Sequence, residues 1–81
     1  MQKINNLQDL FLTRVRKNQT NLTVYLMNGY QIRGHITGFD AFVVVLMSDG
    51  KQEVIYKHAI STIIPERPVD LSPEERTESA R

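Results

Sequence analysis

The sequence predicts a mainly β domain in which one N-terminal α-helix precedes a five-stranded, strongly bent antiparallel barrel. The apolar residues follow a helical period over about residues 6–18 and alternate from about residue 21 onward. The alternating runs are short, turn residues separate them, and glycines interrupt the second run. One helix followed by short, bent strands is typical of a small closed barrel. The 81 residues are enough for one such domain.

The helix is predicted because its larger apolar residues share one helical face: Leu7, Leu10, Phe11 and Val15. Asn5 or Asn6 can cap the N-terminus, since a side-chain oxygen there accepts a hydrogen bond from a free backbone N–H. The polar stretch that starts at Asn18 ends the helix.

Five strands are expected over about residues 22–27, 30–39, 42–47, 52–56 and 60–64. Asn28-Gly29 is a hairpin-turn dipeptide between the first two strands. Gly34 and Gly38 interrupt the second strand, and glycines there predict a sharp bend or a close approach of backbone. The third run is apolar without a break, so we expect it to be buried on both faces.

Composition excludes several classes of protein. The chain is 41% hydrophobic but has no apolar run of the roughly 18 residues that a membrane helix needs. Its N-terminus lacks the apolar region of a signal peptide, so we expect a cytoplasmic protein that does not bind membranes. There is no cysteine and there are two histidines, which argues against disulfides and metal sites. We expect no cofactor.

Charge is distributed unevenly along the chain. Residues 1–65 carry seven lysines and arginines against four acids, whereas residues 66–81 carry three arginines against five acids. We interpret residues 1–65 as the folded domain and the proline-rich, acidic residues 66–81 as a disordered tail. A net charge of this size is ordinary for one chain, but it would attract polyanions if several copies added their fields in a ring.

Self-association is expected on two grounds. A domain of this length buries too little surface on folding to be more than marginally stable as a monomer. The apolar fifth strand ends the fold, and an open strand edge invites pairing with another chain. Head-to-tail pairing with the fourth strand of a second copy would close a homo-oligomeric ring if the rotation suits.

One seven-residue segment, YKHAIST at residues 56–62, resembles a signature of the Hfq family of bacterial Sm-like RNA chaperones. The remaining pattern is similar at compatible spacing in Leu7-Gln8-Asp9, Phe11-Leu12, Tyr25-Leu26, Asn28-Gly29, Gly34, Phe39-Asp40 and Phe42-Val43. The resemblance covers residues 3 to about 68. It implies a helix on an Sm-like (SH3-like) barrel, a homohexameric ring, and a role in post-transcriptional regulation and stress response. The implied partners are small regulatory RNAs and mRNAs, which the ring would anneal.

On the face that bears the helices, the resemblance implies pockets for uridine-rich RNA ends. The residues at these positions, called here the proximal group, are Gln8, Ala41, Phe42, Tyr56, Lys57 and His58, all of which except Ala41 match the family's motif. An aromatic face such as that of Phe42 can stack a base, while lysine and histidine donate hydrogen bonds to it. The alternatives are a core-filling Phe42 and a His58 that bonds the backbone in a turn. Ala41 stands where many members have Gln or Asn.

On the opposite face, the resemblance implies binding of adenine-rich segments. The residues assigned to this face, called here the distal group, are Tyr25, Leu26, Gly29, Tyr30, Gln31, Ile32, Arg33, Gln52 and Thr62. All except Gln52 match the family's positions, and Gln52 lies one place before the family's glutamine, on the opposite face of its strand. The alternative is that Tyr25 and Tyr30 pack on each other across two strands. Glu53 occupies the position where some members have a purine-reading Gln. This departure favours a two-nucleotide over a three-nucleotide repeat.

The resemblance also implies a third surface, a lateral rim of basic residues near the helix end that contacts RNA bodies. The candidates are Arg14, Arg16 and Lys17, of which Arg16 and Lys17 fall on the family's rim positions. The alternative is that they only complement the helix dipole. Asn18 and Gln19 follow where some members add another arginine, which predicts weaker annealing at this edge.

Three other functions are alternatives. An enzyme is disfavoured because Ser61 and His58 lack an evident orienting acid and the chain has no phosphate-binding Gly-rich loop, and we expect no small-molecule substrate. A protein-interaction ring without specific RNA binding fits the strand pattern equally well. A cold-shock barrel would need an aromatic-rich segment that this chain lacks.

Overall fold

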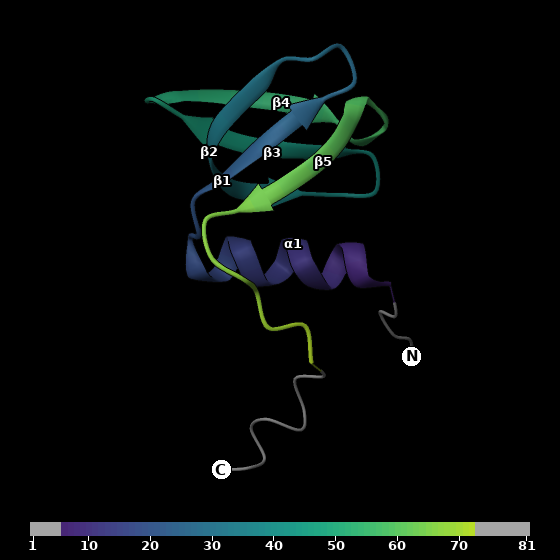
Figure 1. Cartoon of the computed structure of the whole chain (residues 1–81), viewed down its shortest axis with the longest axis vertical. Coiled ribbons are helices and arrows are strands. Elements are labelled where there is room, and N and C mark those ends of the chain that lie inside the picture. Colours follow the sequence, from purple (N-terminus) through teal and green to yellow (C-terminus); the bar gives the residue numbers. More distant parts are fainter. Residues whose placement is uncertain (1–5, 73–81) are drawn as a thin grey trace.

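The computed structural model describes residues 6–72, which form one helix and five strands in the predicted order (Figure 1). Helix α1 (Leu7–Asn18) begins after Asn6, whose side-chain oxygen accepts a 2.7 Å hydrogen bond from the Asp9 N–H. It ends where Gln19 adopts a left-handed conformation with φ of 51°. The predicted helix is therefore confirmed, with Asn6 as its N-cap.

The strands are β1 (Leu22–Leu26), β2 (Gln31–Phe39), β3 (Val43–Ser48), β4 (Lys51–Tyr56) and β5 (Ile60–Pro65). A short 3-10 helix, η1 (Lys57–Ala59), separates β4 from β5. All neighbouring strands are antiparallel, in the order β4-β3-β2-β1-β5. The prediction of five short antiparallel strands is confirmed. Within the described chain, this order leaves β4 and β5 at the two edges of the sheet.

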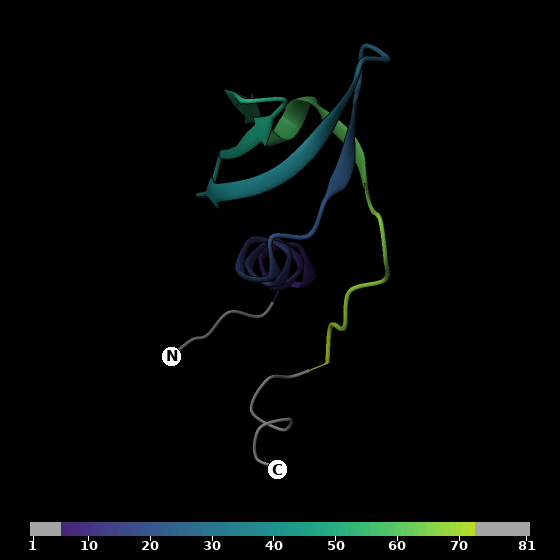
Figure 2. The ribbon, with the colours of Figure 1, turned by 90° about the vertical axis from the view of Figure 1, so that its left-hand side faces the viewer.

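The sheet bends along β2, which changes partner in mid-strand (Figure 2). Its first half pairs with β1 as far as Gly34, and its second half pairs with β3 from His35 onward. At Gly34 the backbones approach so closely that an added Cβ would overlap the carbonyl oxygen of Met47. Gly38 lies beside a register shift and has open space around it. The predicted close approach is thus found at Gly34, whereas Gly38 has no close neighbour and lies next to a register shift.

Helix α1 covers one side of the bent sheet and contributes Leu12 and Val15 to the core (Figures 1 and 2). The other buried residues come from the strands: Leu22, Val24, Ile36, Val44, Leu46 and Ile55. The predicted apolar face of the helix is partly wrong, because Leu7 is 65% exposed. Helical spacing alone could not show that the inward face is rotated toward Leu12.

Strand β3 is buried on one face only, which corrects the expectation of burial on both. Val44 and Leu46 are buried, whereas Val43 and Val45 are half-buried. The second face of β3 is the outer face of the sheet, and within residues 6–72 no element covers it completely.

After β5, the described part of the expected tail runs past α1 (Figures 1 and 2). Val69 packs against the core, and the Arg14 guanidinium donates hydrogen bonds to the backbone carbonyls of Asp70 and Ser72. Residues 66–72 thus have defined contacts, although composition alone led us to expect disorder from residue 66 onward. Residues 73–81, the rest of that tail, lie outside the described range. No helix within residues 6–72 has the length and hydrophobicity needed to cross a membrane.

The two strand glycines provide a matched test of this packing. We expect Gly34→Ala to lower the free energy of unfolding by about 1–3 kcal/mol, because its methyl group displaces the backbone of β3. We expect Gly38→Ala to change it by less than about 1 kcal/mol, because nothing lies near the added methyl group. Urea unfolding at equal protein concentration measures both. Equal losses for the two variants would contradict the close approach.

Candidate nucleic-acid interface

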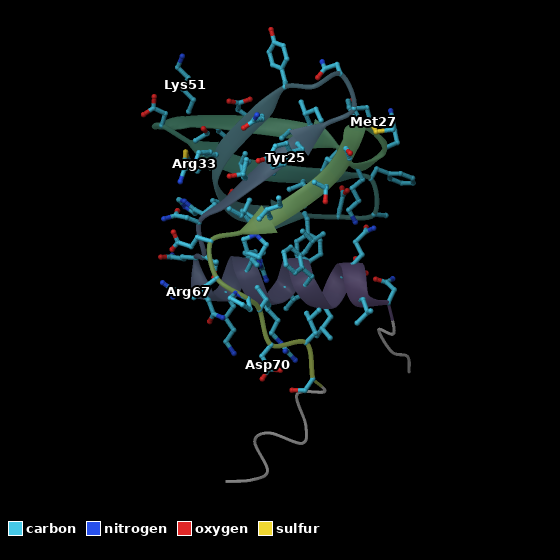
Figure 3. All side chains as sticks on the ribbon, in the orientation of Figure 1. Tyr25, Met27, Arg33, Lys51, Arg67 and Asp70 are labelled. Atoms are coloured by element: carbon cyan, nitrogen blue, oxygen red, sulfur yellow. The ribbon has the colours of Figure 1, made fainter. Side chains whose placement is uncertain are left out.

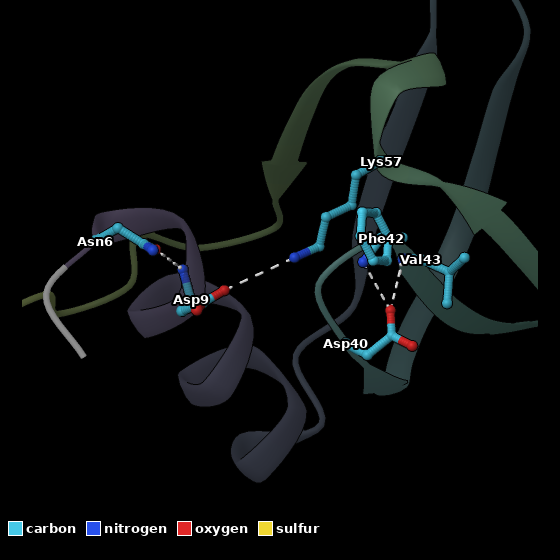
Figure 4. Close-up of polar contacts among 6 residues, drawn as sticks. All are labelled: Asn6, Asp9, Asp40, Phe42, Val43 and Lys57. Atoms are coloured by element: carbon cyan, nitrogen blue, oxygen red, sulfur yellow. Dashed lines mark hydrogen bonds and ion pairs between the residues drawn. The ribbon is translucent and has the colours of Figure 1, made fainter. Parts of the chain in front are cut away.

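The loop between β2 and β3 presents Phe42 to solvent. The Asp40 carboxylate accepts hydrogen bonds of 2.8 Å from the N–H groups of both Phe42 and Val43 (Figure 4). The hydrogen bond from the Phe42 N–H has the largest effect on the pKa of the Asp40 carboxyl, and with the bond from Val43 it lowers that pKa below its ordinary value. The charge of Lys57 acts in the same direction. The Phe42 ring is left 74% exposed, so the alternative that it fills the core is wrong for this chain.

Lys57 connects this loop to the helix. Its N–H donates a 2.8 Å hydrogen bond to the Phe42 carbonyl. Its ammonium lies 3.7 Å from an Asp9 carboxylate oxygen on α1 (Figure 4). The same ammonium lies 5.6 Å from the centre of the Phe39 ring. The side chain is only 16% exposed, so Asp9 and Phe39 hold its charge in one place. The Lys57 ammonium is therefore a positioned cation, and the backbone of this residue is bonded to the Phe42 loop.

The remaining members of the proximal group lie next to this loop and cation. The rings of Tyr56 and His58 stack, with centroids 5.7 Å apart and planes 19° apart. His58 therefore contacts an aromatic ring, in addition to lying in the short turn where the alternative has it bond only the backbone. Gln8 and Lys57 line one groove of about 390 Å³ between α1 and β5. The structure thus brings together Gln8, Ala41, Phe42, Tyr56, Lys57 and His58 at the α1 end of β4 and η1.

The distal group centres on one row of residues across three strands. Tyr25 on β1 stands opposite Gln31 on β2 and opposite Thr62 on β5, and residues directly opposite share a face of the sheet. Tyr25 therefore pairs with Gln31, and the alternative of a Tyr25–Tyr30 cross-strand pair is wrong. Tyr30 precedes β2 in the hairpin tip and is 69% exposed, next to Gly29 with φ of 95°.

Other members of the distal group have different surroundings. Leu26 and Ile32 are half-buried and pack against the core, while Arg33 is exposed. Gln52 is exposed on β4, at the sheet edge opposite the one that carries Thr62. Thr62 also lines the groove that contains Gln8 and Lys57. A single chain therefore does not bring Gln52 and Thr62 together.

The exposed rings of the two groups, Tyr30 and Phe42, lie at different ends of the molecule, although Thr62 of the distal group lines the groove with Gln8 and Lys57. The hairpin tip between β1 and β2 lies far from α1, whereas the Phe42 loop faces the N-terminal end of α1 (Figures 2 and 4). Tyr25 and Arg33 lie on the sheet, and Asp70 lies beyond the helix on the other side (Figure 3). One chain thus offers two separate surfaces on which an aromatic ring is flanked by hydrogen-bonding groups.

The three rim candidates divide into two environments. Arg16 and Lys17 are exposed, and the Arg16 guanidinium lies 5.9 Å from the centre of the Phe39 ring. Arg14 is half-buried and donates to the chain at Asp70 and Ser72 instead. The structure therefore separates Arg14 from the other two cations.

Sequence reasoning assigned no role to three residues that organise the site: Asp9, Phe39 and Asp40. Asp40 could have been identified, because an Asp between two strands commonly accepts hydrogen bonds from backbone N–H groups two or three residues later in a turn. The positions of Asp9 and Phe39 beside Lys57 depend on how α1 packs on the sheet, and no local pattern reports that. In residues 6–72, no three acidic or histidine side chains gather as metal ligands would.

Comparison with known proteins agrees with this architecture. The profile described as Hfq protein matches residues 7–70. A protein of Moorella thermoacetica named RNA-binding protein Hfq is 58% identical over 74 residues, which are 91% of this chain and 88% of that protein. Its namesake in Brevibacillus brevis is 49% identical over 96% of this chain and 99% of its own length.

Among solved structures, a 1.55 Å crystal structure of "the pleiotropic translational regulator, Hfq" superimposes with a TM-score of 0.72 and 51% identity. The match covers 73% of this chain and 98% of that one. The barrel is therefore of the Sm-like type that the sequence predicts. With its family profile, its relatives and its fold in agreement, this chain belongs to the Hfq protein family.

Proposed function

We propose that this protein is an RNA chaperone, not an enzyme, that binds RNA on two opposite faces of a ring and promotes annealing of the bound strands. The proximal group takes uridine-rich ends of small regulatory RNAs, and the distal group takes adenine-rich segments of mRNA. The observation that carries the proposal is the Phe42 ring, 74% exposed in a loop that Asp40 and Lys57 hold in place. An exposed aromatic ring that is held in place can stack a base with little loss of conformational freedom.

The chemistry of the proximal group suits a single-stranded base. Stacking of a base on an aromatic ring contributes about 1–3 kcal/mol. His58 and Gln8 can donate hydrogen bonds to uracil carbonyls, and Lys57 supplies a positive charge beside them. Ala41 cannot form a polar contact with its side chain, so we expect fewer hydrogen bonds per uridine than in members that have Gln or Asn there.

The ring is proposed as a homohexamer in which β4 of one copy pairs with β5 of the next. Both strands lie at open edges of the described sheet, and three apolar side chains on them are largely exposed: Val54, Tyr56 and Ile64. Such pairing would bring Gln52 of one copy toward Thr62 and Tyr25 of its neighbour. The distal site would then be shared between subunits, with the two-nucleotide repeat favoured by Glu53.

The two faces are tested with single substitutions. We expect Phe42→Ala or His58→Ala to weaken oligo-uridine binding about tenfold, because each removes a base contact, and to leave oligo-adenosine binding unchanged. Tyr30→Ala should do the reverse. Fluorescence anisotropy with short labelled oligonucleotides measures both affinities. Matched losses on both RNAs for all three variants would argue against separate faces.

The same titrations distinguish RNA binding from a protein-interaction ring. If cations of the protein neutralise phosphates, the logarithm of the binding constant falls linearly with the logarithm of the salt concentration. A protein-interaction ring would bind both RNAs weakly and without preference for either base, and that result would overturn the proposal.

Asp40 is predicted to act through Phe42. We expect Asp40→Ala to weaken oligo-uridine binding, because the loop loses both acceptor bonds, and Asp40→Asn to retain more affinity, because its amide oxygen still accepts. Since the folded-state pKa is lowered, the carboxylate stabilises the loop above the ordinary pKa of 3.8. This contribution is lost as the pH falls through the lower folded value.

An NMR titration of the Asp40 carboxyl measures this shift directly. A midpoint at or above 3.8 in the folded protein would contradict the two hydrogen bonds. Unchanged oligo-uridine binding by Asp40→Ala would show that the loop does not position the base.

The rim is assigned to Arg16 and Lys17. We expect Arg16→Ala to slow annealing of two complementary RNAs more than it weakens equilibrium binding, because exposed cations act mainly on encounter. Arg14→Ala removes the same charge from the same helix, but its guanidinium is engaged by the Asp70 and Ser72 carbonyls. Stopped-flow annealing should therefore be slowed by Arg16→Ala and nearly unaffected by Arg14→Ala. Equal rates for wild type and Arg16→Ala would remove the rim from the mechanism.

A further inference from the structure

A lateral groove of about 380 Å³ lies between the C-terminal half of α1 and the second half of β2. Its polar lining consists of Thr13, Arg16, Lys17, Gln19, His35 and Thr37. None of the described residues that line it is acidic. The groove therefore combines cations with neutral hydrogen-bonding side chains, which is the composition of an anion site.

The groove exists because β2 changes partner. Strand β1 pairs with β2 only as far as Gly34, and from His35 onward β2 pairs with β3 alone. Within residues 6–72, the side of β2 that β1 leaves has no strand partner, and α1 lies there instead. The register shift between Ile36 and Gly38 also takes Thr37 out of the regular pairing. Local geometry thus opens this side of the strand toward the helix cations.

His35 is the one residue lining the groove whose charge can change near neutral pH, since imidazole titrates between about pH 5 and pH 8. From α1, the charged groups that share the groove with it are Arg16 and Lys17. In the sheet, His35 stands opposite Met47 on β3, and Met47 stands opposite Gln52 on β4, so both register neighbours are uncharged. No carboxylate in the groove is available to pair with a protonated His35.

We infer that His35 is a pH-dependent phosphate contact, which binds an RNA phosphate in this groove together with Arg16 and Lys17. The inference rests on the proposed function, in which the rim contacts RNA bodies. A positive charge on His35 attracts the phosphate that Arg16 and Lys17 also contact. Proton uptake by His35 and phosphate binding therefore favour each other, because the coupling between two binding events is reciprocal.

The test uses the full-length protein and a blunt RNA hairpin, which has no single-stranded tail for the proximal or distal groups. We expect the affinity of the wild type to increase about two- to fivefold between about pH 8 and pH 5.5, the size of one exposed ion pair. His35→Gln should bind with little change over this range. His35→Arg should bind tightly at both pH values, because its charge is permanent. Circular dichroism verifies that both variants are folded.

An equal gain in affinity for wild type and His35→Gln would overturn the inference. So would a His35→Arg variant that still depends on pH as the wild type does. His58 is the only other histidine in the sequence, and an oligo-uridine titration over the same range measures its contribution separately. If only the hairpin affinities lack the expected pH dependence, the role of His35 is refuted and the proposed function stands. If none of the RNAs binds, both are refuted.

Discussion

The open edges of one short sheet are the constraint on which the rest of the structure depends. Backbone N–H and C=O groups at β4 and β5 have no strand partner on their outer side within the described chain. Val54 on β4 and Ile64 on β5 leave apolar surface exposed beside those edges. A chain this small has little other surface to bury. In the proposed ring, pairing of the two edges between copies would satisfy these backbone groups, cover the apolar side chains and repeat every surface site around the ring.

The bend at Gly34 then decides where those sites face. Because β2 pairs with β1 on one side of the bend and with β3 on the other, the hairpin that carries Tyr30 points away from α1. The Phe42 loop, by contrast, lies beside the helix. Phe39 connects this loop region to the rim, since its ring lies within 6 Å of both the Lys57 ammonium (5.6 Å) and the Arg16 guanidinium (5.9 Å).

Much of the fold was predictable because its signals are local. Asn6 and the polar residues after Asn18 bound the helix, and the change of period locates the strands. Packing was less predictable. The exposure of Leu7 and the half-burial of Val43 depend on which face of the helix and which face of the sheet turn toward the core, and the spacing of apolar residues in the sequence does not show this. For the candidate site, the sequence could identify which residues carry suitable side chains, but it could not show which residues contact one another. The pairing of Lys57 with Asp9, and the engagement of Arg14 by the Asp70 carbonyl, join segments distant in sequence.

Native mass spectrometry of the intact protein tests the edge-pairing account most directly, because it counts the copies that share backbone hydrogen bonds. The account predicts one closed assembly of six copies that persists on dilution to the concentrations at which RNA binds, with no stable smaller species. A folded single chain as the main species at those concentrations would contradict it.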